Sequence, residues 1–136
     1  MTHTPVGGIA DPRFFPSHDP AFASFPFSEA VQLGHLLFVS GQIGNAPGAI
    51  TLVPGGIAAE SKKALDNIRT ILTRHGSALE HVVKFTVFLA DMQEWSAFNT
   101  IYRGFFPGRF PSRSALAAKE LISGARVEIE CIAYVP

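Results

Sequence analysis

The most constraining feature of this 136-residue chain is one apolar stretch, Val82–Leu89. Nearly every residue in it is β-branched, aromatic or aliphatic, which is typical of a strand that is covered on both faces of a sheet. We therefore expect this segment to lie in the middle of a sheet. The remainder of the chain has to supply the neighbouring strands and the layers that bury it.

Two segments with helical spacing flank this stretch. In residues 57–75, apolar residues recur every three or four positions with charged residues opposite them, and Gly76 follows. In the second segment, Asp91-Met-Gln-Glu94 has the pattern of a capping box, and aromatic residues then recur at helical spacing before Pro107 and Gly108. The sequence predicts two amphipathic helices, the second of which buries an aromatic stripe formed by Trp95, Phe98, Tyr102 and Phe105.

Four shorter segments have the composition of strands: Ala30–Leu33, Leu36–Ser40, Ser112–Ala118 and Val127–Tyr134. A tight turn at Gly34-His35 joins the first two, and residues 45–56 form a loop or an irregular hairpin. The order is strands, helix, strand, helix, strands. It predicts an α+β two-layer sandwich, with one mixed sheet and two helices on one face. The uncovered face must then be curled, polar or pressed against another subunit.

Residues 1–25 are expected to be an extended, proline-rich leader, and residues 26–136 a single domain. The prolines exclude regular helix and central strand from the leader, and its phenylalanines are expected to hold it on the surface. Hydrophobic residues make up 47% of the chain and charged residues only 16%, so we expect a homo-oligomer that covers part of the apolar surface.

Charge and cysteine content narrow the classes of function. The net charge is zero and no run of like charges occurs, so the sequence has no electrostatic footprint for nucleic acid or anionic lipid. Cys131 is the only cysteine, which excludes an intrachain disulfide and fits a reducing cytoplasm. We find no signal-peptide pattern and no apolar segment long enough to span a membrane. The five histidines lack metal-ligand spacing, so no metal site is expected.

Arg113 and Glu128 are the best candidates for chemistry. Each lies near the start of a predicted strand, and we expect two neighbouring strands to bring them together. The planar guanidinium of Arg113 can bind a carboxylate through two parallel hydrogen bonds, with the small Ala115 and Ala117 on the same face leaving room. Burial beside a bound acid would raise the pKa of Glu128 and suit it to proton transfer near neutrality. We expect Glu130 to form a structural ion pair.

Taken alone, an arginine just after a proline is more often a solvated or salt-bridged loop residue than a ligand-binding residue. Taken alone, Glu128 and Glu130 are as often on a solvated sheet face as in a site. Ser40 lacks the histidine and acid of a nucleophile motif, so we expect it to donate a hydrogen bond or to end a strand. Cys131 alternates with valine and isoleucine and is most simply a core residue.

The chain also resembles the RidA (YjgF) family of enamine/imine deaminases. The matching segments lie in the family's order over residues 26–134: Pro26-Phe-Ser-Glu-Ala30, Leu37-Phe-Val-Ser-Gly-Gln42, Asp66-Asn-Ile68, Val82–Leu89, Asp91-Met92, Asn99, Tyr102, Pro111-Ser-Arg-Ser114 and Val127-Glu-Ile-Glu130.

The resemblance implies a chorismate-mutase-like homotrimer with clefts between subunits. It also implies cofactor-free hydrolysis of 2-imino acids, such as 2-iminobutanoate and 2-iminopropanoate, to 2-keto acids and ammonia. Arg113 would bind the substrate carboxylate and Glu128 would handle the water. Five further positions would line the cleft or its edge as substrate-binding residues: Phe27, Ser40, Gly41, Tyr102 and Ala115.

Two positions depart from the family pattern. Active deaminases commonly have tyrosine where Phe27 stands and cysteine where Ala115 stands, and neither replacement side chain can form a hydrogen bond. Three hypotheses therefore remain open. The first is the deaminase, the second is a small-carboxylate-binding module without turnover, and the third is an RNA-acting protein, which the neutral charge makes the weakest.

Overall fold

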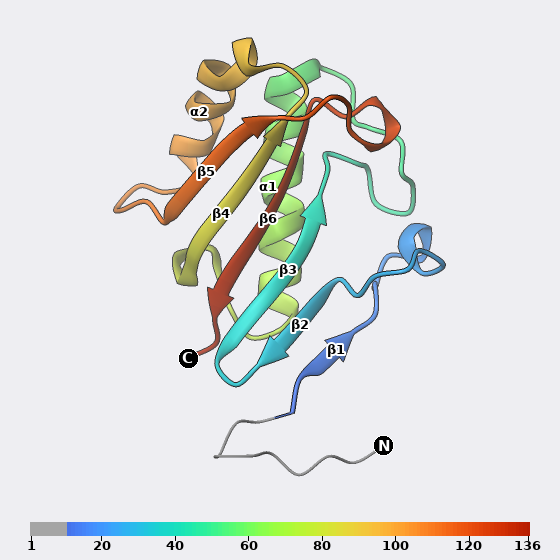
Figure 1. The fold of residues 1–136 in the computed structure, drawn as a ribbon, viewed down its shortest axis with the longest axis vertical. Helices are drawn as coiled ribbons and strands as arrows, with labels where there is room; N and C mark the ends of the chain where they lie inside the picture. The colour runs from blue at the N-terminus through green and yellow to red at the C-terminus, as the bar shows by residue number, and fades with distance from the viewer. Residues whose placement is uncertain (1–10) are drawn as a thin grey trace.

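The structure, a computed structural model, describes residues 11–136 and forms one mixed sheet with two helices (Figure 1). The first ten residues of the expected leader lie outside the described residues. The strands are β1 (Arg13–Phe15), β2 (Ala30–Leu33), β3 (Leu36–Gln42), β4 (Val82–Leu89), β5 (Ser112–Ala117) and β6 (Val127–Tyr134). The helices are α1 (Gly56–Arg74) and α2 (Trp95–Gly104), with short 3₁₀ turns η1 (Pro20–Phe22), η2 (Leu79–His81), η3 (Met92–Glu94) and η4 (Ile122–Gly124).

The strand order is β1-β2-β3-β6-β4-β5, and among these described strands only the β4–β5 pair is parallel. A parallel neighbour requires a crossover connection, and α2 provides it between β4 and β5. The apolar stretch that forms β4 therefore lies inside the sheet, between β5 and β6, as the sequence predicted.

Both helices cover the same face of the sheet, so the predicted two-layer α+β arrangement is confirmed (Figure 1). Alternate β4 residues, Phe85, Val87 and Leu89, are fully buried under the helices together with the apolar side of α1. The prediction that β4 is covered on both faces is wrong for the single chain, since Val83 is 44% exposed. The described residues bury only the helix side of the strand.

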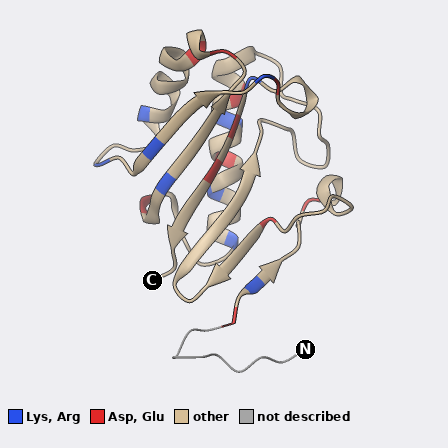
Figure 2. Ribbon diagram, in the orientation of Figure 1, with Lys and Arg blue, Asp and Glu red and all other residues tan. Residues whose placement is uncertain are grey.

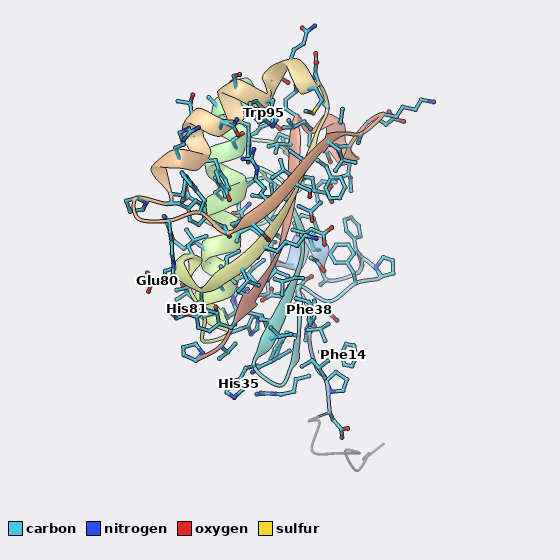
Figure 3. All side chains as sticks on the ribbon, turned by 60° about the vertical axis from the view of Figure 1, so that its left-hand side comes forward. Phe14, His35, Phe38, Glu80, His81 and Trp95 are labelled. Atoms are coloured by element: carbon cyan, nitrogen blue, oxygen red, sulfur yellow. The ribbon has the colours of Figure 1, made fainter. Side chains whose placement is uncertain are left out.

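The opposite face of the sheet, called here the open face, carries exposed apolar side chains. Leu36 and Phe38 on β3 and Leu116 on β5 are 42%, 39% and 45% exposed. Phe38 pairs in register with Ile132, and Figure 3 shows it on the side of the sheet away from α1 and α2. An open apolar face of this kind is typical of a surface that another protein subunit covers.

Part of the expected leader belongs to the sheet. Residues Arg13–Phe15 form the edge strand β1, paired antiparallel with β2, and Phe15 stacks on the ring of His75 at 4.1 Å between centroids. Proline has no backbone N–H to donate to a neighbouring strand, so a segment flanked by prolines can form an edge strand, which is paired on one side only. Phe15 thus ties this part of the leader to the end of α1.

A buried carboxylate reinforces the same junction. Glu29 is 5% exposed and accepts hydrogen bonds from Arg74 at 2.6 and 2.8 Å, from His75 at 2.6 Å and from the backbone N–H of His18 at 2.9 Å. Burial alone would raise the pKa of Glu29, but the hydrogen bonds from His18, His75 and Arg74 stabilise the charged form and hold the pKa below its usual range. This Glu29 network joins β2, α1 and the chain that precedes η1.

Replacing Glu29 with glutamine is expected to lower the free energy of unfolding by about 2 kcal/mol at neutral pH, since hydrogen bonds to a charged group contribute roughly 1.5 to 3 kcal/mol each. Because the folded pKa lies below the ordinary value of 4.5, the contribution is present above that pH and is lost as pH falls through the folded pKa. Urea unfolding of Glu29→Gln and the wild type between pH 3 and pH 7 measures it.

The matched control is Asp66→Asn, whose carboxylate forms exposed pairs with Lys62 and Arg69 on α1. Exposed pairs contribute roughly 1 kcal/mol or less. Equal losses in the two variants, or a Glu29→Gln loss that grows below pH 4.5, would contradict the role given to the Glu29 network.

Candidate functional site

The sheet places Arg113 and Glu128 on strands that are not adjacent. The expectation that two neighbouring strands deliver them is wrong, because β4 lies between β5 and β6. Arg113 pairs with the buried Phe85 and so belongs to the helix side, whereas Glu128 alternates with buried residues of β6 and belongs to the open face. The two side chains therefore point to opposite faces, with their strands about 10 Å apart across the sheet.

Arg113 lies against the aromatic stripe of α2. Its guanidinium carbon is 4.8 Å from the ring centroid of Tyr102, 5.6 Å from that of Phe98 and 5.9 Å from that of Trp95. The faces of aromatic rings attract cations, so these contacts hold the guanidinium while leaving its hydrogen-bond donors unused. Within residues 11–136, no ion pair or hydrogen bond engages the Arg113 side chain.

The same residues border a small hollow, called here the Arg113 hollow. It measures about 220 Å³ and is lined by Trp95, Asn99, Tyr102, Arg103, Phe110, Pro111 and Arg113. Tyr102 is 4% exposed, and burial raises the pKa of its phenol to about 12, against the opposing effect of the Arg113 charge. The Tyr102 hydroxyl and the Asn99 carbonyl oxygen are both buried without a partner in the described residues. Tyr102 is thus uncharged at neutral pH, and its ring faces the Arg113 guanidinium.

Ala115 lies two positions after Arg113, beside Val87 in the register of β4 and β5. It packs against the hydrophobic core and does not line the Arg113 hollow. The structure therefore brings Arg113 and Tyr102 together, with Ala115 one step further along the same face.

The other predicted site residues meet in a second, larger space, called here the Glu128 cavity. It has a volume of about 650 Å³, and Phe27, Ser40, Gly41 and Glu128 all line it. The cavity lies between the 17–29 segment, the loop after β3 and α1. Phe22 of the expected leader also lines it, together with residues that the sequence did not indicate, among them Ile122 and members of the Glu29 network. Their contacts join segments far apart in the chain, which periodicity does not reveal.

A β-bulge in β3 shapes the floor of the Glu128 cavity. Val39 pairs with Cys131 and Gln42 with Ile129, so β3 has one extra residue at Ser40-Gly41. The Ser40 hydroxyl donates to the carbonyl of Ser28 at 2.6 Å, which confirms its predicted hydrogen-bonding role.

Gly41 lies directly against the Glu128 carboxyl group. A methyl group on Gly41 would overlap the Glu128 carboxyl group, with the carboxyl carbon only 3.0 Å away. The absence of a side chain at Gly41 therefore lets the carboxyl group lie directly on the bulge.

Burial raises the pKa of Glu128, and the negative charge of Glu130 on the same face of β6 raises it further. Glu130 does not form the expected ion pair with any described residue. Its effect is instead to favour the protonated form of its neighbour. A carboxyl group with a raised pKa can take up and return a proton near neutral pH.

Among residues 11–136, no group of three or more His, Cys, Asp or Glu side chains is placed to hold a metal ion. Cys131 is buried, and burial raises the pKa of its thiol to about 12, so it lies in the core as the sequence predicted. None of the described helices combines the length and hydrophobicity needed to cross a membrane.

Residues 18–135 match the sequence pattern of the family described as Endoribonuclease L-PSP. The chain belongs to this family, the RidA (YjgF) family. A mouse protein named 2-iminobutanoate/2-iminopropanoate deaminase is 45% identical over 108 residues, which cover 79% of this chain and 80% of the mouse protein. The human protein of the same name is 43% identical over 108 residues, covering 79% of each chain.

Solved structures of RidA relatives share the fold. The yeast protein YEO7 superimposes with a TM-score of 0.86 at 32% identity, covering 93% of this chain and all of that one. The YjgF gene product of E. coli superimposes with a TM-score of 0.82 at 29% identity, covering 91% of this chain and 99% of that one. The YjgF-like fold expected from the resemblance is confirmed.

The structure predicts that Glu130 sets part of the proton affinity of Glu128. Changing Glu130 to glutamine removes a nearby negative charge, so the pKa of Glu128 should fall towards its ordinary value without reaching it, because burial remains. Carbon-detected NMR titration of the Glu128 carboxyl group measures the change. Glu80→Gln, at η2, is the control and should leave that pKa unaltered; an unchanged pKa in Glu130→Gln would show that Glu130 has no such influence.

Proposed function

We propose that this RidA-family protein hydrolyses 2-imino acids to 2-keto acids and ammonia, with Arg113 binding the substrate carboxylate and Glu128 acting on the water. The observation that carries the proposal is the Arg113 guanidinium, which is partly buried against three rings and engages no described anion. The mouse and human relatives named as 2-iminobutanoate/2-iminopropanoate deaminases support the choice of reaction.

Arg113 would hold the substrate. A guanidinium can form two parallel charge-assisted hydrogen bonds with a carboxylate, which fixes both the position and the plane of the bound acid. Partial burial weakens competition from water and strengthens those bonds. Because the imine carbon is adjacent to the carboxylate, this contact also fixes the direction from which water reaches it.

Glu128 would move the protons. As a carboxylate it removes a proton from water while the water oxygen bonds to the imine carbon of the protonated imine, giving a carbinolamine. The same carboxyl group then returns that proton to the amine nitrogen. The carbon–nitrogen bond then breaks and neutral ammonia leaves, while the Glu128 carboxylate takes the remaining hydroxyl proton and the carbonyl of the 2-keto acid forms. That proton then converts the ammonia to ammonium, which restores the carboxylate. Burial and the nearby Glu130 charge raise the pKa of Glu128, which makes its carboxylate a stronger base for this exchange.

We further propose that the complete site forms between subunits of a homotrimer. Within one chain, Arg113 and Glu128 lie on opposite faces of the sheet, so one substrate cannot contact both side chains. A head-to-tail ring would bring the Arg113 hollow of one copy to the Glu128 cavity of the next. The exposed apolar residues of the open face supply a surface for such an assembly.

A subunit-mixing experiment tests this arrangement. Arg113→Ala and Glu128→Gln should each abolish most hydrolysis of 2-iminobutanoate when assayed alone. After the two variants are unfolded together and refolded at equal amounts, about one quarter of the sites in a randomly mixed ring should combine an intact Arg113 with an intact Glu128. Activity should therefore recover to about one quarter of the wild-type value.

Mixing the two folded variants without dissociation is the control and should give no recovery. If co-refolded mixtures stay as inactive as the separate variants, although mass spectrometry detects mixed oligomers, each site must draw both residues from one chain. That outcome would contradict the intersubunit site.

A second candidate function is binding of 2-keto acids without turnover. The observation that favours it is the pair Phe27 and Ala115, neither of which offers a side-chain hydrogen-bond donor. Calorimetric binding of 2-oxobutanoate combined with an unaccelerated decay of 2-iminobutanoate would select this function over the deaminase.

An RNA-acting role is the weakest alternative, although the family description includes the word endoribonuclease. The net charge is zero, and Figure 2 shows Lys and Arg spread over α1, α2, β4 and β5 with acidic residues on neighbouring elements. Binding to single strands normally uses a groove that is continuously positive and carries exposed aromatic rings.

A further inference from the structure

The Glu128 cavity is larger than a short imino acid requires. Its volume of about 650 Å³ falls within the range of roughly 300 to 1,000 Å³ that is typical of pockets for drug-sized ligands. Substrates such as 2-iminobutanoate would leave much of this space to water. The chemistry of the remaining walls therefore indicates which side chain a substrate carries.

Most polar groups on these walls already have partners. The Glu29 carboxylate is fully engaged by its network, and the Asp19 carboxylate accepts hydrogen bonds from two backbone N–H groups at 2.9 and 3.0 Å. The Asn67 amide donates to oxygen atoms of the loop that follows β3. Apart from Glu128, Lys63 is the charged wall residue whose side chain has neither an ion pair nor a hydrogen bond within residues 11–136, whereas Asp19 has its two backbone donors.

The apolar part of the wall is built from aromatic residues of the segment before β2. Phe22 and Phe27 line the cavity, and Phe25 packs edge-on against Phe22 at 5.6 Å and against Phe27 at 6.1 Å between centroids. Ile122 of η4 adds a further apolar side chain.

The position of this wall is fixed relative to Glu128. The hydrogen bond from Ser40 to the carbonyl of Ser28 anchors the residue after Phe27 to the bulge, on which the Glu128 carboxyl group lies. Phe27 is nevertheless 45% exposed, so its ring offers unoccupied apolar surface beside the acid.

We propose that Phe22, Phe27 and Ile122 form a subsite for large apolar side chains, so that the preferred substrates are the imino acids related to branched-chain and aromatic amino acids. This inference rests on the proposed function for the position of the reacting group. A substrate whose imine carbon lies at Glu128 can extend its side chain along the Phe27 ring. Each methylene group buried there is expected to improve kcat/KM by up to about fourfold.

The experiment compares imino acids that an L-amino-acid oxidase generates in situ from alanine, norvaline, leucine, phenylalanine and glutamate. For the wild-type protein, kcat/KM should rise from the alanine product to the leucine and phenylalanine products. In Phe22→Ala, the ratio of kcat/KM for the leucine product to that for the alanine product should fall about tenfold or more, since the removed ring was worth several methylene groups of contact.

Phe14→Ala is the matched control, because Phe14 is 66% exposed on β1 and does not line the cavity. The leucine-to-alanine ratio of kcat/KM in this variant should equal that of the wild type. Circular dichroism checks that Phe22→Ala is folded. Phe22→Leu keeps an apolar side chain at this position, so its leucine-to-alanine ratio of kcat/KM should fall less than that of Phe22→Ala. A flat or falling series in the wild type would overturn the subsite. Faster hydrolysis of the glutamate product than of the norvaline product would overturn it in favour of anion recognition by Lys63.

Calorimetry with the corresponding 2-keto acids separates this inference from the proposed reaction. Tighter binding of 4-methyl-2-oxopentanoate and phenylpyruvate than of pyruvate, without accelerated imine decay, would retain the apolar subsite and reject the deaminase. Accelerated decay with no size preference in either assay would retain the deaminase and reject the subsite.

Discussion

The Arg113 guanidinium packs against aromatic rings of α2, and the proposed binding of a carboxylate depends on this contact. The parallel pairing of β4 and β5 forces the chain through α2, and this crossover places the stripe over the row of β5 that contains Arg113. Aromatic rings hold a cation without neutralising it, whereas a carboxylate partner would occupy its donors. Partial burial then makes binding of an external anion more favourable than it would be at a solvated arginine.

The acid side of the site depends on a different part of the sheet. The bulge at Ser40-Gly41 lets the Glu128 carboxyl group lie against the backbone, and burial with the nearby Glu130 charge raises its pKa. The Glu29 network holds the segment before β2 in place beside this bulge. Each chain thus presents the Arg113 side chain on one face of the sheet and the Glu128 side chain on the other, and it has an open apolar face through which copies could associate.

Local pattern predicted most of the elements. The bounds of β2, α1, β4 and β6 agree with the sequence within about one residue, because alternation and helical spacing act over short distances. The position of β6 next to β4 was not predicted, since strand order depends on how crossovers pack and not on periodicity. Local pattern did not predict the Glu29 network, because Arg74 at the end of α1 and His75 after it are 45 and 46 residues from Glu29. The bulge was missed because Ser40-Gly41 resembles an ordinary strand end.

The role of Arg113 can be measured most directly through the conservative variant Arg113→Lys. Lysine keeps the positive charge but lacks the planar fork, so it cannot form two parallel bonds with a carboxylate. Isothermal titration of 2-oxobutanoate should show binding about tenfold or more weaker than that of the wild type, with the oligomer intact. Equal affinity in the two proteins would contradict carboxylate recognition by the guanidinium.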